Sequence, residues 1–234
     1  MKQIIALGGG GFSMKPENLL LDQYIVNQVD KEKPNVCFIP AASGDSESYI
    51  ERFYEAYKKL SATPIHLSLF SPNWGESLES FILQQDIIYV GGGSSRNLLT
   101  LWKEWGLDHL LLKAYEQGTV LAGISAGGIC WFQEGVTDSG GPTYREISAL
   151  GILQGSFCPH YEGDEKRRPA YHRLLQEQRI KGGYGVDDSV ALHFIDEQLH
   201  QVVASVDGKK AFYATNSEGK TEERVITPLF LGNR

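Results

Sequence analysis

Short apolar runs alternate with longer amphipathic segments over the first two thirds of the chain, and this alternation constrains the fold more than any other feature. The expected strands are residues 3–7, 36–39, 64–69, 86–90 and 119–122, and the expected helices are residues 18–29, 48–60, 96–105, 108–117 and 126–132. Strands that alternate with helices form right-handed crossovers and a parallel sheet. Because the strands are apolar throughout, we expect helices to cover both faces of that sheet.

The last third of the chain has a different pattern. Residues 135–145 have the composition of an irregular loop, and residues 164–181 that of a charged helix. Strands are expected at residues 155–161, 191–194, 201–206, 211–214 and 225–230, the later ones being antiparallel. A chain of 234 residues is long enough to bury a full core. We therefore expect one α/β domain over residues 1–234: a three-layer sandwich built on a mainly parallel sheet, with antiparallel strands toward the C-terminus.

The charge balance and the apolar runs exclude two classes of partner. The net charge is -7, from 29 acidic and 22 basic residues, whereas a nucleic-acid-binding protein normally presents a basic face. No apolar run approaches the roughly 20 residues that span a bilayer. The first residues also lack the long apolar stretch of a signal peptide. We expect no nucleic acid or membrane partner, and a cytoplasmic location.

Cofactor and metal motifs are also missing from the sequence. The cysteines Cys37, Cys130 and Cys158 are too scattered for a zinc site and contain no CxxC pair, so we expect reduced thiols. Four glycines at 8–11 follow the first strand, but a dinucleotide-binding motif begun at the first of them needs a glycine where Ser13 stands. No P-loop lysine follows either. We expect neither a cofactor nor a metal.

Residues 123–127 read Gly-Ile-Ser-Ala-Gly and match the G-x-S-x-G nucleophile elbow. This motif turns a strand sharply into a helix, so that the serine hydroxyl is exposed in a strained position. The glycines remove side chains that would block the turn, and the residue after the serine offers its N–H to an oxyanion. An apolar strand precedes the motif and a predicted helix follows it. The sequence therefore predicts Ser125 as a nucleophile, with Ala126 as an oxyanion donor.

A nucleophilic serine needs a base, and the base needs a carboxylate that orients it. Six histidines compete, and His160 is favoured because it ends an apolar segment, where a strand can hold an imidazole rigidly. Asp138 lies between Ser125 and His160 in the sequence, in the loop after the elbow helix. The other candidate acids are Glu134, Glu146, Asp187 and Asp188, and the last two are adjacent and would also suit a substrate amine.

These residues resemble the serine peptidases of the peptidase E (aspartyl dipeptidase) type, which are related to cyanophycinase. The resemblance covers nearly the whole chain and includes residues 8–13, 90–93, 123–127 and 159–161. The order Ser125, Asp138, His160 is similar to the catalytic triad of that family. The resemblance implies a glutamine-amidotransferase-like α/β sandwich and hydrolysis of small peptides, in particular dipeptides with an N-terminal Asp.

The resemblance also suggests how the peptide is held. The oxyanion hole would combine the N–H of Ala126 with donors from the loop that contains Gly92 and Gly93. A substrate aspartate requires a fixed cation, and a guanidinium binds a carboxylate through two parallel hydrogen bonds. The expected substrate-binding residues are Arg167, Arg168, Asp187, which would hold the substrate ammonium, and Tyr161.

The expected partner is a small peptide substrate, and the sequence is compatible with a homodimer. Two other functions are compatible with the same residues. One is a cyanophycinase-like or other amide hydrolase that keeps the triad and changes the substrate. The other is a catalytically silent protein that binds a small metabolite in the same crevice.

Overall fold

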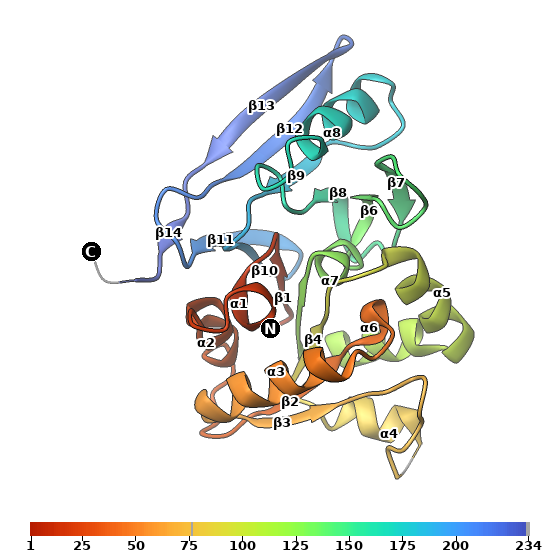
Figure 1. Cartoon of the computed structure of the whole chain (residues 1–234), viewed down its shortest axis with the longest axis vertical. Helices are drawn as coiled ribbons and strands as arrows, with labels where there is room; N and C mark the ends of the chain where they lie inside the picture. Colours follow the sequence, from red (N-terminus) through yellow and green to blue (C-terminus); the bar gives the residue numbers. More distant parts are fainter. Residues whose placement is uncertain (76, 233–234) are drawn as a thin grey trace.

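The computed structural model describes residues 1–75 and 77–232. Within these residues one large mixed sheet, sheet A, has the strand order β14-β11-β10-β1-β5-β4-β2-β3 (Figure 1). Its strands are β1 (Gln3–Leu7), β2 (Asn35–Ile39), β3 (Thr63–His66), β4 (Ile87–Val90), β5 (Val120–Ile124), β10 (Val190–Ile195), β11 (Gln198–Ala204) and β14 (Leu229–Phe230). The five N-terminal strands are mutually parallel, whereas β10 is antiparallel to both β1 and β11. The predicted mainly parallel sheet is confirmed.

Helices pack on both faces of sheet A. They are α1 (Gly11–Met14), α2 (Leu20–Val26), α3 (Glu47–Lys59), α4 (Leu78–Leu83), α5 (Ser95–Trp105), α6 (Leu107–Glu116) and α7 (Ala126–Ile129), with a short 3-10 helix, η1 (Ala41–Ser43), after β2. The side chains of α1, α2 and α3 belong to one buried cluster and those of α4 to α7 to another. The expected coverage of both faces is therefore confirmed.

The strands of sheet A send alternate side chains into these two cores. In β1, for example, Ile5 and Leu7 pack in the cluster that contains Phe12 of α1. Ile4 and Ala6 pack in the cluster that contains Trp102 of α5. Because both faces are apolar, the strands read as unbroken apolar runs in the sequence. This arrangement leaves the loops at the C-terminal ends of the parallel strands as the place for a site.

A second sheet, sheet B, has the strand order β13-β12-β9-β8-β6-β7 and lies above sheet A in the view of Figure 1. Its strands are β6 (Phe132–Thr137), β7 (Arg145–Ser148), β8 (Leu153–Cys158), β9 (Gly183–Val186), β12 (Ala211–Ser217) and β13 (Lys220–Ile226). Helix α8 (Arg167–Gln176) packs on it through a buried cluster that includes Tyr171 and Leu174. Sheet B also contributes Phe132 and Phe157 to the core that it shares with sheet A.

Sheet B corrects the predictions for the last third of the chain. The expected loop 135–145 begins inside β6, and the helix expected at 126–132 ends at Ile129. Gly135 belongs to a strand because a Cβ there would lie 2.5 Å from Ile129, so the glycine allows close packing rather than marking a loop. Strand β9 was not predicted, and the tail forms β13 and β14 rather than one strand. In the described part of the chain, no helix has the length and apolar character needed to cross a membrane.

Candidate active site

Ser125 stands on a sharp turn between β5 and α7. Its backbone has φ 54° and ψ -111°, a conformation that non-glycine residues rarely adopt and that persists only where the surroundings enforce it. A Cβ on Gly123 would lie 2.0 Å from the carbonyl oxygen of Gly127, and one on Gly127 would lie 2.1 Å from that of Val90. Both positions therefore need glycine. The local geometry is that of the predicted nucleophile elbow.

His160 follows β8 and lies beside the elbow. Its Nε2 is 2.9 Å from Oγ of Ser125, within hydrogen-bond distance. Its backbone also has a positive φ, 52°, and its N–H donates to the carbonyl oxygen of Gly8 at the end of β1. The structure thus brings together the two residues that the sequence analysis paired, although 35 positions separate them.

The carboxylate next to His160 belongs to Asp188, not to Asp138. Oδ1 of Asp188 lies 2.5 Å from Nδ1 of His160, so both ring nitrogens of the histidine have partners. The side chain of Asp138 is 61% exposed, and its carboxylate faces Arg167 at 3.9 Å. The expectation that Asp138 orients the base is therefore wrong, because Asp138 follows β6 and its carboxylate faces Arg167 of α8. Asp188 was one of the other candidate acids in the sequence analysis.

The other candidate acids are engaged elsewhere. Glu134 accepts a hydrogen bond from the backbone N–H of Lys181. Glu146 forms an ion pair with Arg179, at 2.9 Å. Neither contact involves the histidine, so the turn between β9 and β10 is the element that supplies the carboxylate.

Two glycines, Gly9 and Gly163, pack closely against the carboxylate of Asp188. A Cβ on Gly9 would lie 1.9 Å from Oδ1 of Asp188 and 3.0 Å from Nδ1 of His160. A Cβ on Gly163 would lie 2.5 Å from Oδ2 of Asp188. The N–H of Ser189 donates to the carbonyl oxygen of Gly9, which ties the acid's turn to the end of β1. The N-terminal glycine run therefore makes room for the histidine–carboxylate pair, a use that the sequence analysis did not assign.

The predicted oxyanion donors differ in their availability. Ala126 is the first residue of α7, where a backbone N–H has no partner within the helix. The N–H of Gly92 donates to the buried hydroxyl of Tyr49 at 3.2 Å, so this amide already has a partner. The N–H of Gly93 has no hydrogen-bond partner among the described residues. A Cβ on Gly93 would lie 2.2 Å from the carbonyl oxygen of Ala42, so this position also requires glycine.

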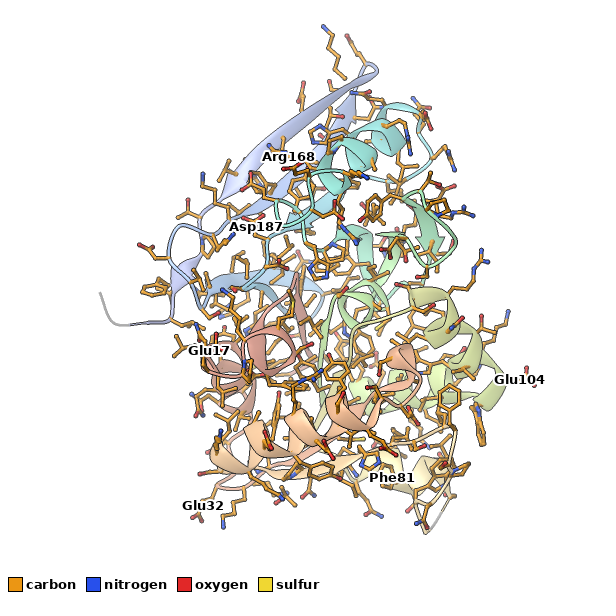
Figure 2. All side chains as sticks on the ribbon, in the orientation of Figure 1. Glu17, Glu32, Phe81, Glu104, Arg168 and Asp187 are labelled. Carbon is orange, nitrogen blue, oxygen red and sulfur yellow. The ribbon has the colours of Figure 1, made fainter. Side chains whose placement is uncertain are left out.

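Three of the predicted substrate-binding residues have partners within the protein. Asp187 is buried, and its two carboxylate oxygens accept the backbone N–H groups of Glu162 and Lys210. Arg168 pairs with Glu162 and Glu223, and Figure 2 labels Arg168 and Asp187 in the upper half of the molecule. These contacts stabilise the fold around the histidine rather than offer free groups to a ligand.

Tyr161 is the third of these residues. Its ring is fully buried and its hydroxyl donates to Glu223. The same hydroxyl lies 2.9 Å from Nε2 of His172. Because Tyr161 directly follows His160, these contacts anchor the backbone that carries the histidine.

Arg167 differs from these three. Its side chain is only 8% exposed and stacks on the ring of Tyr144, with the guanidinium carbon 4.4 Å from the ring centre. One Nη donates to the carbonyl oxygen of Val136 at 3.2 Å. The buried Nε–H has no hydrogen-bond partner among the described residues. Arg167 thus retains a free donor.

The cysteines do not supply a competing nucleophile. All three are buried, and burial raises the pKa of the Cys158 thiol to about 12. Burial also raises the pKa of Cys130 well above its ordinary value. A thiol must be deprotonated to act as a nucleophile. Within residues 1–75 and 77–232, His, Cys, Asp and Glu side chains form no group of three or more that could hold a metal ion.

The chain matches known proteins in sequence and in fold. The model of peptidase family S51 matches residues 4–202. The chain is 57% identical to a Bacillus subtilis (strain 168) protein named "Uncharacterized peptidase YgaJ", over 99% of this chain and all of that protein. It is 26% identical to peptidase E of Pasteurella multocida (strain Pm70), over 72% of this chain and 75% of that protein. The fold is similar to the crystal structure of a peptidase from an acI-B1 Actinobacterium, with a TM-score of 0.71, 18% identity and coverage of 97% and 95% of the two chains.

Proposed function

Because this chain belongs to peptidase family S51, we propose that it hydrolyses small peptides by a serine-type mechanism with Ser125 as the nucleophile. One observation carries the proposal: Oγ of Ser125 lies 2.9 Å from Nε2 of His160, on a strained turn that exposes the hydroxyl. A nucleophile, a base within hydrogen-bond distance and an orienting third group together form the arrangement that activates a serine.

In the proposed mechanism, His160 accepts the proton of Ser125 as Oγ attacks the scissile carbonyl carbon. The oxyanion that forms is stabilised by the N–H groups of Ala126 and Gly93, neither of which has a hydrogen-bond partner among the described residues. His160 then gives its proton to the leaving amine as the C–N bond breaks, leaving an acyl-enzyme. Water attacks the ester by the same route, and Oγ regains its proton.

Asp188 has a positioning and electrostatic role in this scheme. A carboxylate at Nδ1 holds the imidazole in the tautomer that leaves Nε2 free to accept a proton. It also stabilises the imidazolium that forms during attack. Its 2.5 Å contact with Nδ1 of His160 supports this assignment.

We further propose a preference for dipeptides with an N-terminal aspartate, with Arg167 as the cation that binds the substrate carboxylate. This preference rests on the resemblance to aspartyl dipeptidases and on the free, buried Nε–H of Arg167. An ion pair inside a site of low polarity is stronger than one in water. The engaged residues Arg168 and Asp187 have no substrate role in this proposal.

The test is a panel of dipeptides that differ only in the first residue, such as Asp-Leu, Asn-Leu and Ala-Leu. The proposal predicts hydrolysis of Asp-Leu and a loss on the order of 10⁴-fold or more in kcat for Ser125→Ala. Retained turnover in that variant would contradict the assigned nucleophile. Equal turnover of Asp-Leu and Ala-Leu would contradict the acidic preference and leave the nucleophile assignment intact.

The role of Arg167 is tested separately. Arg167→Met should reduce kcat/KM for Asp-Leu and leave that for Ala-Leu unchanged. Arg168→Met is the matched control, since its guanidinium already pairs with two glutamates, and it should retain the preference. If Arg168→Met, rather than Arg167→Met, abolished the preference, Arg167 would not be the substrate cation.

A further inference from the structure

A cavity of about 570 Å³ has α3 as one of its walls. Its walls come from the segment after η1, from α3, from β3 and from residues 68–74, and they include Phe81 of α4. Figure 2 labels Phe81 near the bottom of the molecule and Asp187, the neighbour of Asp188, in its upper half. The lining residues include none of the residues assigned to peptide hydrolysis. This volume is in the range of small-molecule sites.

The most unusual group in this cavity is the carboxylate of Asp45. Both of its oxygens are shielded from solvent, and neither has a hydrogen-bond partner among the described residues. A shielded carboxylate without a partner is costly, and native proteins normally pair such groups. Glu47 is a second acid in the lining, and none of the described lining residues is a lysine or an arginine. The described lining therefore carries acidic side chains and no lysine or arginine.

His66 does not supply the missing positive charge. Its Nδ1 lies 2.9 Å from the hydroxyl of Tyr54, and burial lowers its pKa below the ordinary value although Asp45 opposes this shift. The imidazole is therefore neutral at neutral pH. The described lining therefore offers no cationic side chain to Asp45.

The remaining lining mixes polar side chains, such as Ser68, Ser71 and Asn73, with apolar ones that are partly exposed. Phe70 is 55% exposed and Ile65 is 37% exposed, and the ring of Trp74 also lines the cavity. Aromatic faces attract organic cations and also bury apolar groups. A metal ion fits this lining poorly, because no group of three or more acidic, histidine or cysteine side chains suited to a metal occurs in the described residues.

We propose that this cavity binds a small organic cation, a primary amine carried on an aromatic or apolar body, with the Asp45 side chain turning to bring a carboxylate oxygen onto the ammonium and with the body against Phe70 and Trp74. The proposal is independent of the peptidase assignment. An aromatic primary amine matches the two properties of the lining, namely an unpaired carboxylate and exposed rings.

The test uses 2-phenylethylamine and its neutral analogue 2-phenylethanol, with binding to the full chain measured by calorimetry. The native chain should bind the amine and bind the alcohol at least tenfold more weakly, as expected for loss of a charged hydrogen bond. Asp45→Asn should weaken amine binding by about 10- to 100-fold. Glu55→Gln is the matched control, since it removes an exposed acid of α3 outside the lining and should retain amine binding.

A second variant keeps the proposal testable if Asp45→Asn fails to fold. Phe70→Ser changes a largely exposed side chain and should weaken amine binding by about threefold or more. None of the variants should change dipeptide hydrolysis, so failure here is separable from failure of the proposed peptidase. Equal affinity for the amine and the alcohol, absence of amine binding at millimolar concentration, or full amine affinity in a folded Asp45→Asn chain would overturn the proposal.

Discussion

Asp188 lies 2.5 Å from Nδ1 of His160, and the two residues follow neighbouring parallel strands of sheet B. His160 follows β8 of sheet B, whereas Asp188 lies in the turn that leads from β9 of sheet B into β10 of sheet A. Because β10 pairs with β1, this turn meets the C-terminal end of β1 and its glycines. The proposed catalytic machinery therefore depends on how the two sheets are joined.

The first prediction separates the two candidate acids. Asp188→Asn should lower kcat for dipeptide hydrolysis by about 10³- to 10⁴-fold, because the amide favours the wrong imidazole tautomer. Asp138→Asn makes the same chemical change at an exposed carboxylate and should alter kcat little. Steady-state kinetics of the two variants decides between them. A large loss in Asp138→Asn with normal rates in Asp188→Asn would reverse the assignment.

Gly9 offers a second way to displace the carboxylate. In Gly9→Ala the added methyl group would lie 1.9 Å from Oδ1 of Asp188, so the acid or the β1 end must move. Misplacement of about 1 Å typically costs about 100-fold in rate, and we expect a loss of that order in kcat. Gly208→Ala is the control: its added methyl group meets no atom within 4 Å, so it should strain only the local backbone. Equal kcat values for the two alanine variants would argue against the close fit at Asp188.

Tyr49 is predicted to position the oxyanion loop. Its hydroxyl accepts the N–H of Gly92 at 3.2 Å and a hydrogen bond from Ser13 at 2.7 Å. Tyr49→Phe leaves that amide unpaired, and we expect kcat to fall by about tenfold with little change in KM. Tyr54→Phe removes another hydroxyl of α3 and should not affect kcat. Affinity for a peptide aldehyde, which forms an oxyanion on the serine, should fall in parallel with kcat for Tyr49→Phe. An unchanged aldehyde affinity would limit Tyr49 to a structural role.

Asp22 makes the stability depend on pH. Burial is the main reason why its pKa is raised from 3.8 to about 7, and hydrogen bonds from Phe12 and Tyr57 only partly oppose the shift. Between these two pKa values the native state binds more protons than the unfolded chain, so stability falls as pH rises through this window. The fall is on the order of 4 kcal/mol and is complete above about pH 7.

The Asp22→Asn variant has no ionisable group at this position, so its free energy of unfolding should lack this dependence on pH. Urea unfolding of both chains from about pH 4 to about pH 8 measures it. The free energy of unfolding of the variant should rise relative to the native chain as pH increases. Parallel pH profiles would mean that the buried carboxyl does not titrate in this range.

The elbow and the parallel strands were predictable because each is encoded locally. Residues 123–127 combine an apolar strand, two glycines and a serine, and the close approaches at Gly123 and Gly127 explain why those glycines are needed. His160 could be chosen because it ends an apolar run. Its contact with Ser125 depends on how the two sheets are arranged, which the sequence alone does not show.

The partner of His160 was not predictable from spacing, since it depends on β9, an unpredicted strand that lies parallel to β8 in sheet B. Two features of the sequence are related to this partner but do not identify it: two adjacent acids end a Gly-Val segment, and a glycine run follows the first strand. Sheet B was missed because Gly135 resembled a loop residue and because β9, with its two glycines, lacks an apolar run. The cavity at Asp45 has no sequence signal, because an unpaired carboxylate is visible only once its neighbours are known.

Covalent labelling with a fluorophosphonate tests most directly whether Ser125 is activated by His160. Mass spectrometry of the native chain should find one adduct, located on Ser125. His160→Ala, which keeps the serine, should label far more slowly. Absence of the adduct from Ser125 in the folded native chain, or equal labelling rates in His160→Ala, would contradict the account.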